Sequence, residues 1–397
     1  MRYAVAALLA AHGLLHLLGF LKPFGLARLE GMTGRSLVPL SGAAASAVGV
    51  AWLAAAVVLT GAGALRLLEL KGWWWLTAFG VVLSQALIVL MWHDAKVGTL
   101  ANVLLAVAVV VAAAQARFAG RVEAEARALL RAVPAGAGDV VGLADLEPLP
   151  APIRRWLGAA GVVGRPRVRT VRLLQTGQMR LGRNSGWLNV AAEQYFDVPG
   201  AAFVWSVKTK LFDVLPLLGR DRLAGGHGNM LIVAAGLVTV ANGTGAKIDQ
   251  GTQLRYLAEL VWFPSAALEP YVRWQPLDDH RARATLTKDG TTVSADFTID
   301  DRGRFESLTA QRWYSPPGGT PSLQTWVIPA RAWRRFDGVE VPSQGDAVWK
   351  LPDGDLDYFR WRISHLEHDV PSTFEAQPDR PPAPATQGLH APQAAHE

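Results

Sequence analysis

Residues 38–61 read VPLSGAAASAVGVAWLAAAVVLTG, a stretch without a single Asp, Glu, Lys or Arg. Three further stretches share this property, at 3–20, 73–92 and 97–116. A helix needs about 20 mostly apolar residues to cross the hydrocarbon core of a bilayer, where its backbone must satisfy its own hydrogen bonds. The sequence therefore predicts a four-helix transmembrane domain over residues 1–118.

A cleaved signal peptide is the alternative interpretation of residues 3–20, because Arg2 precedes an apolar run. That run contains His12 and His16, and no pattern of small residues leads from it into a mature domain. We therefore expect a retained helix.

The positive charge of the chain is distributed unevenly. Residues 1–116 hold seven basic and three acidic residues, whereas the remainder holds 32 and 30. Basic residues beside membrane spans set topology, and the chain has no basic run, so nucleic acid is not an expected partner. The absence of Cys excludes disulfides and catalytic thiols.

The basic residues also predict the orientation in the membrane. Four crossings put both chain ends on one side, which collects seven basic residues: Arg2, Arg66, Lys71, Arg117, Arg121, Arg127 and Arg131. The other side has four: Lys22, Arg28, Arg35 and Lys96. Because cytoplasmic loops carry the excess of Lys and Arg, we expect a multi-pass inner (plasma) membrane protein with a cytoplasmic polar domain.

The rest of the chain divides by composition. Residues 119–150 are expected to form a juxtamembrane helix, at 121–133, and a linker rich in Pro, Gly and Ala. A β-rich polar domain is expected at 151–373. The tail at 374–397 is rich in Pro, Ala and Gln and is predicted to be disordered.

Within the polar domain the hydrophobic period changes to two from about residue 167. Residues 281–286 and 293–299 alternate between apolar and polar, and Lys288-Asp289-Gly290 between them predicts a hairpin. We expect roughly ten strands, mostly in an antiparallel meander whose one side is covered by a helix at 253–262. The predicted fold class is α+β: a four-transmembrane-helix bundle followed by a curved meander sheet or half-barrel with a covering helix.

The polar domain resembles a family of uncharacterised bacterial membrane-associated proteins with a domain of unknown function. Five motifs carry the resemblance: LPAPIRRWLGAAG (149–161), GGHGNM (225–230), RYLAELVWFPSA (255–266), Trp274 and RWY (312–314). The resemblance covers residues 150–370 and implies no established activity.

Two further resemblances concern the fold. A curved antiparallel sheet with a helix across its concave face is similar to lipoprotein-carrier half-barrels, which work outside the cytoplasm, opposite to the side that the arginines predict. The four spans resemble small DoxX-like four-helix membrane proteins through their number and the SQ…WHDAKVGTLAN stretch at 84–102.

The membrane half contains a candidate metal site. His12 and His16 stand four residues apart on one face of the first span, and His93 and Asp94 lie at the end of the third. Ionisable groups in membrane spans are costly, so this set suggests a divalent metal, haem or quinone site. The alternative is structural hydrogen bonding between helices.

The polar domain contains candidate ligand-binding residues: Trp205, His227, Arg255, Tyr256, Glu259, Trp262, Trp274 and Arg312. His227 lies between glycines that could expose its imidazole, and Arg255 and Glu259 stand one helical turn apart. Ten tryptophans in this domain could line an apolar groove. The alternatives are a turn, a structural ion pair and a hydrophobic core.

The interpretation that we favour is a membrane protein whose β-rich domain binds a hydrophobic or lipid-like ligand near the bilayer. A membrane redox or metal protein using the intramembrane histidines is the second hypothesis, and a membrane-anchored scaffold without a small ligand is the third. The chain has no G-x-S-x-G or H-E-x-x-H motif, so we do not expect an enzyme. The sequence identifies no particular cofactor and no oligomeric state.

Overall fold

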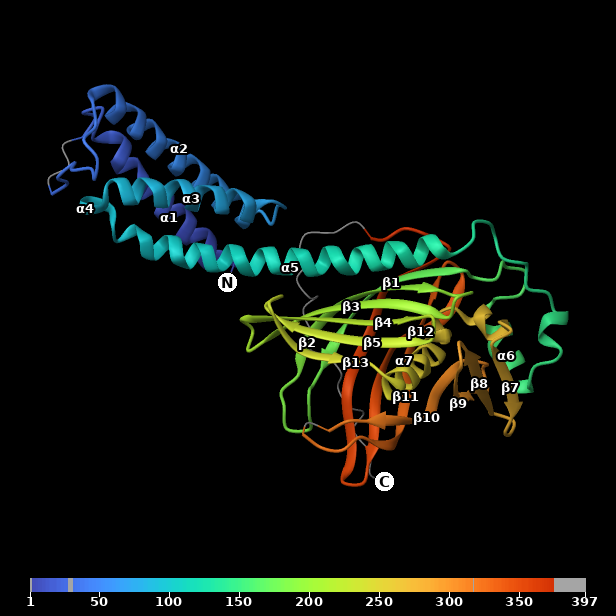
Figure 1. The fold of residues 1–397 in the computed structure, drawn as a ribbon. Coiled ribbons are helices and arrows are strands. Elements are labelled where there is room, and N and C mark those ends of the chain that lie inside the picture. Colours follow the sequence, from blue (N-terminus) through green and yellow to red (C-terminus); the bar gives the residue numbers. More distant parts are fainter. Residues whose placement is uncertain (1, 28–30, 317, 375–397) are drawn as a thin grey trace, which may run out of the picture.

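A computed structural model describes residues 2–27, 31–316 and 318–374 (Figure 1). Its four long apolar helices are long enough to cross a membrane: α1 (Arg2–Leu21), α2 (Gly42–Leu67), α3 (Trp73–Leu90) and α5 (Gly98–Ala132). A short helix α4 (Trp92–Ala95) joins α3 to α5. The predicted tail, apart from Phe374, lies outside the described residues.

Small residues bring α1 and α2 together. A Cβ atom built on Gly13 would lie 3.0 Å from the backbone nitrogen of Thr60, and one on Gly63 would lie 3.2 Å from the carbonyl oxygen of Ala6. Such close approach is typical of helices that pack in a membrane, where van der Waals contact rather than hydrophobic burial drives association.

The fourth apolar span and the juxtamembrane helix form one helix, contrary to the two separate helices that we predicted. α5 is continuous over 35 residues, or about 50 Å at 1.5 Å per residue. The charged residues after Ala116 end the apolar stretch but not the helix, because ion pairs one turn apart, Arg121–Glu125 and Glu123–Arg127, favour helix.

In the described residues, thirteen antiparallel strands build one curled half-barrel sheet, which confirms the α+β class and exceeds the roughly ten strands that we predicted. The strands are β1 (Thr170–Met179), β2 (Leu188–Asp197), β3 (Ala202–Leu211), β4 (Leu215–Ala224), β5 (His227–Ala234), β6 (Val238–Gly243), β7 (Val272–Pro276), β8 (Arg281–Lys288), β9 (Thr291–Ile299), β10 (Phe305–Tyr314), β11 (Ser322–Phe336), β12 (Val339–Leu351) and β13 (Gly354–His368). Residues 215–243, which form β4–β6 and their turns, contain six glycines, and these interrupt a clean alternation of apolar and polar residues.

The sheet consists of two meanders, β1–β6 and β7–β13, joined where β1 pairs with β13. Val171 lies opposite His368 in this pairing. The predicted hairpin between β8 and β9 is confirmed: Asp289 and Gly290 both have positive φ, as a type I′ turn requires.

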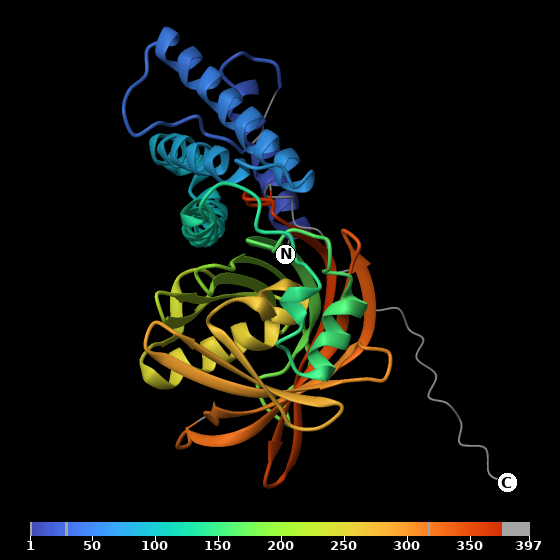
Figure 2. The ribbon, with the colours of Figure 1, turned by 90° about the vertical axis from the view of Figure 1, so that its right-hand side faces the viewer.

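Helices lie on both sides of the sheet (Figure 2). Inside the curl is α7 (Ala246–Glu259), which continues into the short 3-10 helices Leu260–Trp262 and Pro264–Leu268. The end of α7 matches the helix predicted at 253–262, although the observed helix begins seven residues earlier. α6 (Ala151–Ala160) packs near the β8–β9 and β12 strands, preceded by a 3-10 turn at Ala144–Leu146.

The polar half of α5 rests on the outer face of the sheet. Its side chains Val122, Ala126 and Leu130 pack against Ala202 and Val204 of β3. An ion pair of 3.1 Å between Glu125 and the buried Arg220 of β4 supports this contact. The long helix thus connects the membrane-type bundle directly to the half-barrel.

The segment predicted as a linker at 134–150 contributes to the core of the half-barrel. Val141 and Leu146 are buried in the main hydrophobic cluster. Val140 also forms a β-bridge with Pro166. Residues from about 139 therefore pack as part of the β-rich unit.

Candidate functional site

Arg255 of α7 is the centre of a buried polar network on the inner face of the sheet. Its Nε donates to Glu259 Oε1 at 2.8 Å and one terminal nitrogen donates to Asp221 Oδ2 of β4 at 2.8 Å. Gln194 of β2 donates to Glu259 Oε2 at 2.7 Å. The guanidinium also lies 4.5 Å from the ring centre of Trp205.

One cation and two carboxylates share this buried site. Burial raises the pKa of Glu259, and the positive charge of Arg255 opposes that rise. Oδ1 of Asp221 is buried without a hydrogen-bond partner among the described residues. The predicted residues Trp205, Arg255 and Glu259 are therefore brought together, in an arrangement that fastens α7 to the sheet.

The other five predicted residues lie outside this network, and two of them, Tyr256 and Trp262, lie in the domain core. Tyr256 is fully buried, and its hydroxyl bonds to Tyr271 at 2.9 Å and to the Val198 carbonyl at 3.2 Å. Trp262 packs edge-on against Trp361, with ring centres 5.5 Å apart. These contacts belong to the domain core.

His227 and Trp274 are also separate from the Arg255 network. His227 is 86% exposed at the start of β5, with Nδ1 3.6 Å from Asp249 Oδ2. Trp274 Nε1 donates to the Ala267 carbonyl at 2.9 Å, and its ring packs against Trp156 and Phe297.

Arg312 is the centre of a second, aromatic cluster near the end of β10. Its guanidinium carbon lies 4.5 Å from the ring centre of Trp326 and 5.8 Å from that of Trp349. Tyr314 packs on Trp349 at 5.1 Å, and the Trp326 indole donates to the Tyr358 hydroxyl at 3.1 Å. We call Arg312, Tyr314, Trp326, Trp349 and Tyr358 the Arg312 cluster.

No carboxylate of the described residues forms an ion pair with Arg312. A Cβ atom built on Gly251 would lie 3.5 Å from its Nε, which places Arg312 under α7 on the inner face. Sequence analysis singled out Arg312 but not its aromatic partners. The signal for them is the alternation along β10–β13, which puts Trp326 and Trp349 on one face as direct cross-strand partners.

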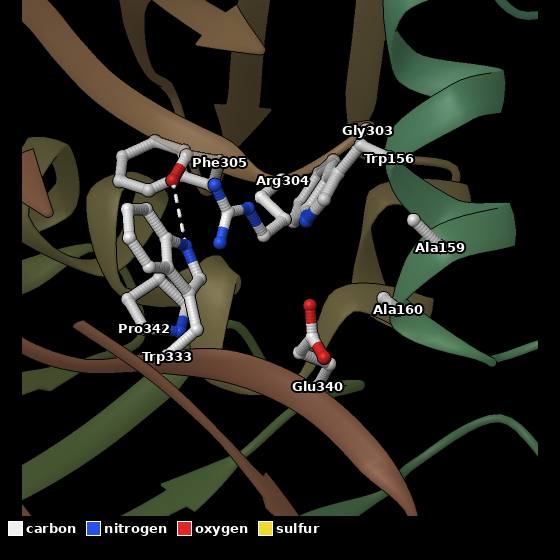
Figure 3. Close-up of a pocket in the computed structure, with 9 residues that line it drawn as sticks. All are labelled: Trp156, Ala159, Ala160, Gly303, Arg304, Phe305, Trp333, Glu340 and Pro342. Atoms are coloured by element: carbon white, nitrogen blue, oxygen red, sulfur yellow. Dashed lines mark hydrogen bonds between the residues drawn. The ribbon is translucent and has the colours of Figure 1, made fainter. Parts of the chain in front are cut away.

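Figure 3 shows a small cavity elsewhere in the domain, between α6 and the β9–β10 turn. Its volume of about 10 Å³ holds one water at most. Arg304 stacks on Trp333 at 4.3 Å, and the Trp333 indole donates to the Phe305 carbonyl at 3.0 Å. This cavity is too small for an organic ligand.

An open groove of about 370 Å³ lies beside α6. Leu143, Leu146, Arg154 and Val163 contribute to its lining. It contains none of the ligand-binding residues that the sequence suggested.

His12 and His16 of α1 take part in a buried polar network between the apolar helices. His12 Nε2 is 2.9 Å from Asn102 Oδ1, and His16 Nε2 is 2.8 Å from Ser84 Oγ. His16 Nδ1 bonds to the carbonyl of His12 at 2.7 Å. Every ring nitrogen except Nδ1 of His12 thus has a named partner on α1, α3 or α5, as expected for polar residues that join membrane helices.

His93 and Asp94 do not join this network. His93 is exposed, and Asp94 accepts hydrogen bonds from the backbone nitrogens of Thr33 at 2.9 Å and Gly34 at 2.6 Å. Although burial acts in the opposite direction, these bonds lower the pKa of Asp94. In the part of the chain that the structure describes, no three His, Asp or Glu side chains are grouped as a metal site.

The fold defines a class of protein: four membrane-length helices connected to a half-barrel domain. Within that class, the chain belongs to a family of unknown function (DUF6544), whose family model matches residues 139–361. This confirms the resemblance of the polar domain to a family of unknown function. The comparisons do not show the DoxX-like resemblance of the helix bundle.

Two solved structures are similar to the chain. One is a putative outer membrane lipoprotein-sorting protein domain from Vibrio parahaemolyticus, with 10% identity, a TM-score of 0.32 and coverage of 58% of this chain and 92% of that one. The other is a DUF1329 family protein from Desulfovibrio piger, with 12% identity, a TM-score of 0.25 and coverage of 58% and 95%. No curated protein matches the chain.

Proposed function

We propose that this protein is a multi-pass membrane protein whose half-barrel binds an amphipathic, anionic ligand, such as a lipid, at the Arg312 cluster. The observation that carries the proposal is a partly buried arginine that lies on tryptophan rings and has no carboxylate partner among the described residues. Arginine is the side chain best suited to bind phosphate or carboxylate groups through paired hydrogen bonds.

The chemistry of the cluster fits both parts of such a ligand. Trp326 and Trp349 are only 3% and 7% exposed, and the guanidinium of Arg312 lies over their rings. The more exposed Tyr314 and Tyr358 add hydroxyl groups. Aromatic rings with polar tips suit the boundary between an acyl chain and its head group. Leu351 and Met179, the last residues of β12 and β1, add apolar surface at the same end of the sheet.

The membrane location supports a lipid as the ligand. Four helices have the length and hydropathy of membrane spans, and α5 joins them to the half-barrel without a break. The distribution of Lys and Arg favours the inner (plasma) membrane with the half-barrel on the cytoplasmic side. Close to a bilayer, lipids are the most abundant amphipathic molecules that can reach a ligand site on the half-barrel.

Binding of phosphatidylglycerol to the purified full-length protein tests this proposal. We expect saturable quenching of tryptophan fluorescence by a spin-labelled phosphatidylglycerol, and a loss of affinity of about tenfold or more in Arg312→Gln, since a hydrogen bond to a charged group contributes about 1.5–3 kcal/mol. Arg283→Gln, which alters an exposed arginine paired with Asp296, is the matched control.

Equal affinity in the Arg312→Gln and Arg283→Gln variants would move the ligand away from the Arg312 cluster. Absence of saturable binding in the unsubstituted protein would reject the ligand-binding function. The membrane-anchored scaffold would then become the better hypothesis.

A further inference from the structure

Two neighbouring hairpin tips of the half-barrel expose large apolar side chains. The β3–β4 tip carries Phe212, which is 82% exposed, and Val214, which is 58% exposed. The β5–β6 tip carries Leu237 and Val238, which are 52% and 63% exposed. Adjacent exposed residues of this size mark a surface that contacts something apolar.

The backbone of the β3–β4 tip is unusual for its sequence. Phe212 and Asp213 both have positive φ, at 51° and 58°. Such a turn favours Asn-Gly, and a bulky aromatic residue is a steric outlier in the left-handed region. The exposed side chain of Phe212 gains little packing energy within the half-barrel to offset this backbone strain. We therefore look for a contact of Phe212 outside the half-barrel.

The position of the tips identifies that contact. A Cβ atom built on Gly236, in the β5–β6 tip, would lie 2.7 Å from the backbone of both Ala114 and Gln115 in α5. The apolar span 97–116 ends at this level of the helix. The β5–β6 tip therefore lies beside the point where the helix leaves the hydrocarbon.

The β3–β4 tip lies at the same level. Leu217 of β4 pairs with Ala234, and the nitrogen of Ala235 donates to the Pro216 carbonyl at 2.7 Å, so the two tips are neighbours across the sheet. Figure 1 shows this end of β3–β5 directed toward the helix bundle.

We propose that these two hairpin tips insert into the head-group region of the bilayer that the helices cross. Lys210, just before the β3–β4 tip, and Arg117, just after the apolar span, are exposed and supply cations for anionic head groups. Asp213, which lies between Phe212 and Val214 in the β3–β4 tip, is exposed and would lie at the depth of the hydrated head groups. This inference rests on the proposed membrane crossing but not on ligand binding at the Arg312 cluster.

Site-specific fluorescence tests the contact, because the chain has no Cys and an introduced cysteine is therefore its only labelling site. An NBD label is placed at Phe212→Cys or Leu237→Cys in the full-length protein, reconstituted in vesicles of phosphatidylcholine and phosphatidylglycerol. We expect several-fold stronger quenching by a lipid nitroxide near the head group than for Arg302→Cys, in the exposed β9–β10 turn at the opposite end of the strands.

A label at Val107→Cys, on an exposed position within the span of α5, reports the membrane crossing itself through a nitroxide deep in the acyl chain. Suppose that the deep nitroxide quenches the label at 107, but the head-group nitroxide quenches the labels at 212 and 237 no more than the label at 302. This result would overturn tip insertion and leave the membrane crossing intact. No quenching at 107 would overturn the membrane crossing. Tip labels shielded from both lipid nitroxide and aqueous iodide would show a protein partner, such as a second copy, and would also overturn the proposal.

Discussion

Arg255 carries the positive charge that lies between two buried carboxylates in the half-barrel. Arg255→Met removes the cation and leaves Glu259 and Asp221 buried close together. We expect the free energy of unfolding to fall by about 3–5 kcal/mol, as found when one partner of a buried ion pair is removed. Urea unfolding of the purified protein, followed by tryptophan fluorescence, measures this loss.

Arg283→Met is the control for Arg255→Met, because Arg283 pairs with Asp296 at 2.6 Å on an exposed part of the sheet. Its loss is expected to cost less than about 1 kcal/mol. Similar losses in the two variants would show that the Arg255 network does not anchor α7.

His368 gives the stability of the half-barrel a pH dependence. Burial lowers the pKa of His368 below its ordinary value of 6.5, and Nε2 lies 3.0 Å from the Trp262 carbonyl. As the pH falls below about 6.5, the unfolded chain takes up a proton before the folded one does, so the free energy of unfolding decreases.

Replacing His368 tests this linkage. In His368→Gln, the decrease in the urea midpoint between about pH 7.5 and 5.5 should be smaller than in the unsubstituted protein. His365→Gln, at an exposed position on the same strand, should leave the decrease unchanged. An unaltered pH dependence in His368→Gln would assign the effect to other groups.

Residue-level prediction from sequence succeeded where the partners are local. The period of the helix was enough to pair Arg255 with Glu259 across one turn. Asp221 and Gln194 come from strands more than 30 residues away, so no local pattern indicates that they complete the network. For the tryptophans beside Arg312, the alternation along β10–β13 indicates which face they share but not that they contact Arg312.

At the level of elements, the contact between the β5–β6 tip and α5 depends on the absence of a side chain at Gly236. Gly236→Ala forces a Cβ atom into the α5 backbone, in addition to the strain of a φ of 76°. Gly290→Ala, with a φ of 81° and open space around it, introduces the strain alone. We expect Gly236→Ala to lower the free energy of unfolding by about 1–3 kcal/mol more than Gly290→Ala.

Urea unfolding of both glycine variants measures this difference. Hydrogen exchange should in addition become faster at residues 112–118 of α5 in Gly236→Ala only. Equal destabilisation by the two substitutions would mean that the tip does not press against the helix.

Element boundaries were predicted less well than element types. The apolar stretch ends at residue 116, but charged residues are compatible with a helix exposed to solvent. The sequence therefore did not reveal that α5 continues to Ala132. The hairpin with the Asp-Gly turn at 289–290 was predicted correctly because positive φ favours these two residue types.

At the level of the whole molecule, the sequence predicted the class of fold but not how the sheet is joined. Alternation and turns predict neighbouring antiparallel strands. The observed strand order confirms this in the two meanders, β1–β6 and β7–β13. The pairing of β1 with β13 connects residues almost 200 positions apart, and it arises from the curl of the complete sheet. Only a three-dimensional argument could have found it.

That pairing has a consequence for biosynthesis. Ribosomes add about 5–20 residues per second, so the edge of β1 stays unpaired for about 10–40 s before β13 emerges. During this interval the helices have already been made, and an open strand edge is a target for wrong pairing with other chains. Co-translational insertion of the helices would hold the nascent chain at the membrane while the edge of β1 is unpaired. The nascent chain would then be kept apart from other nascent copies until β13 pairs with β1.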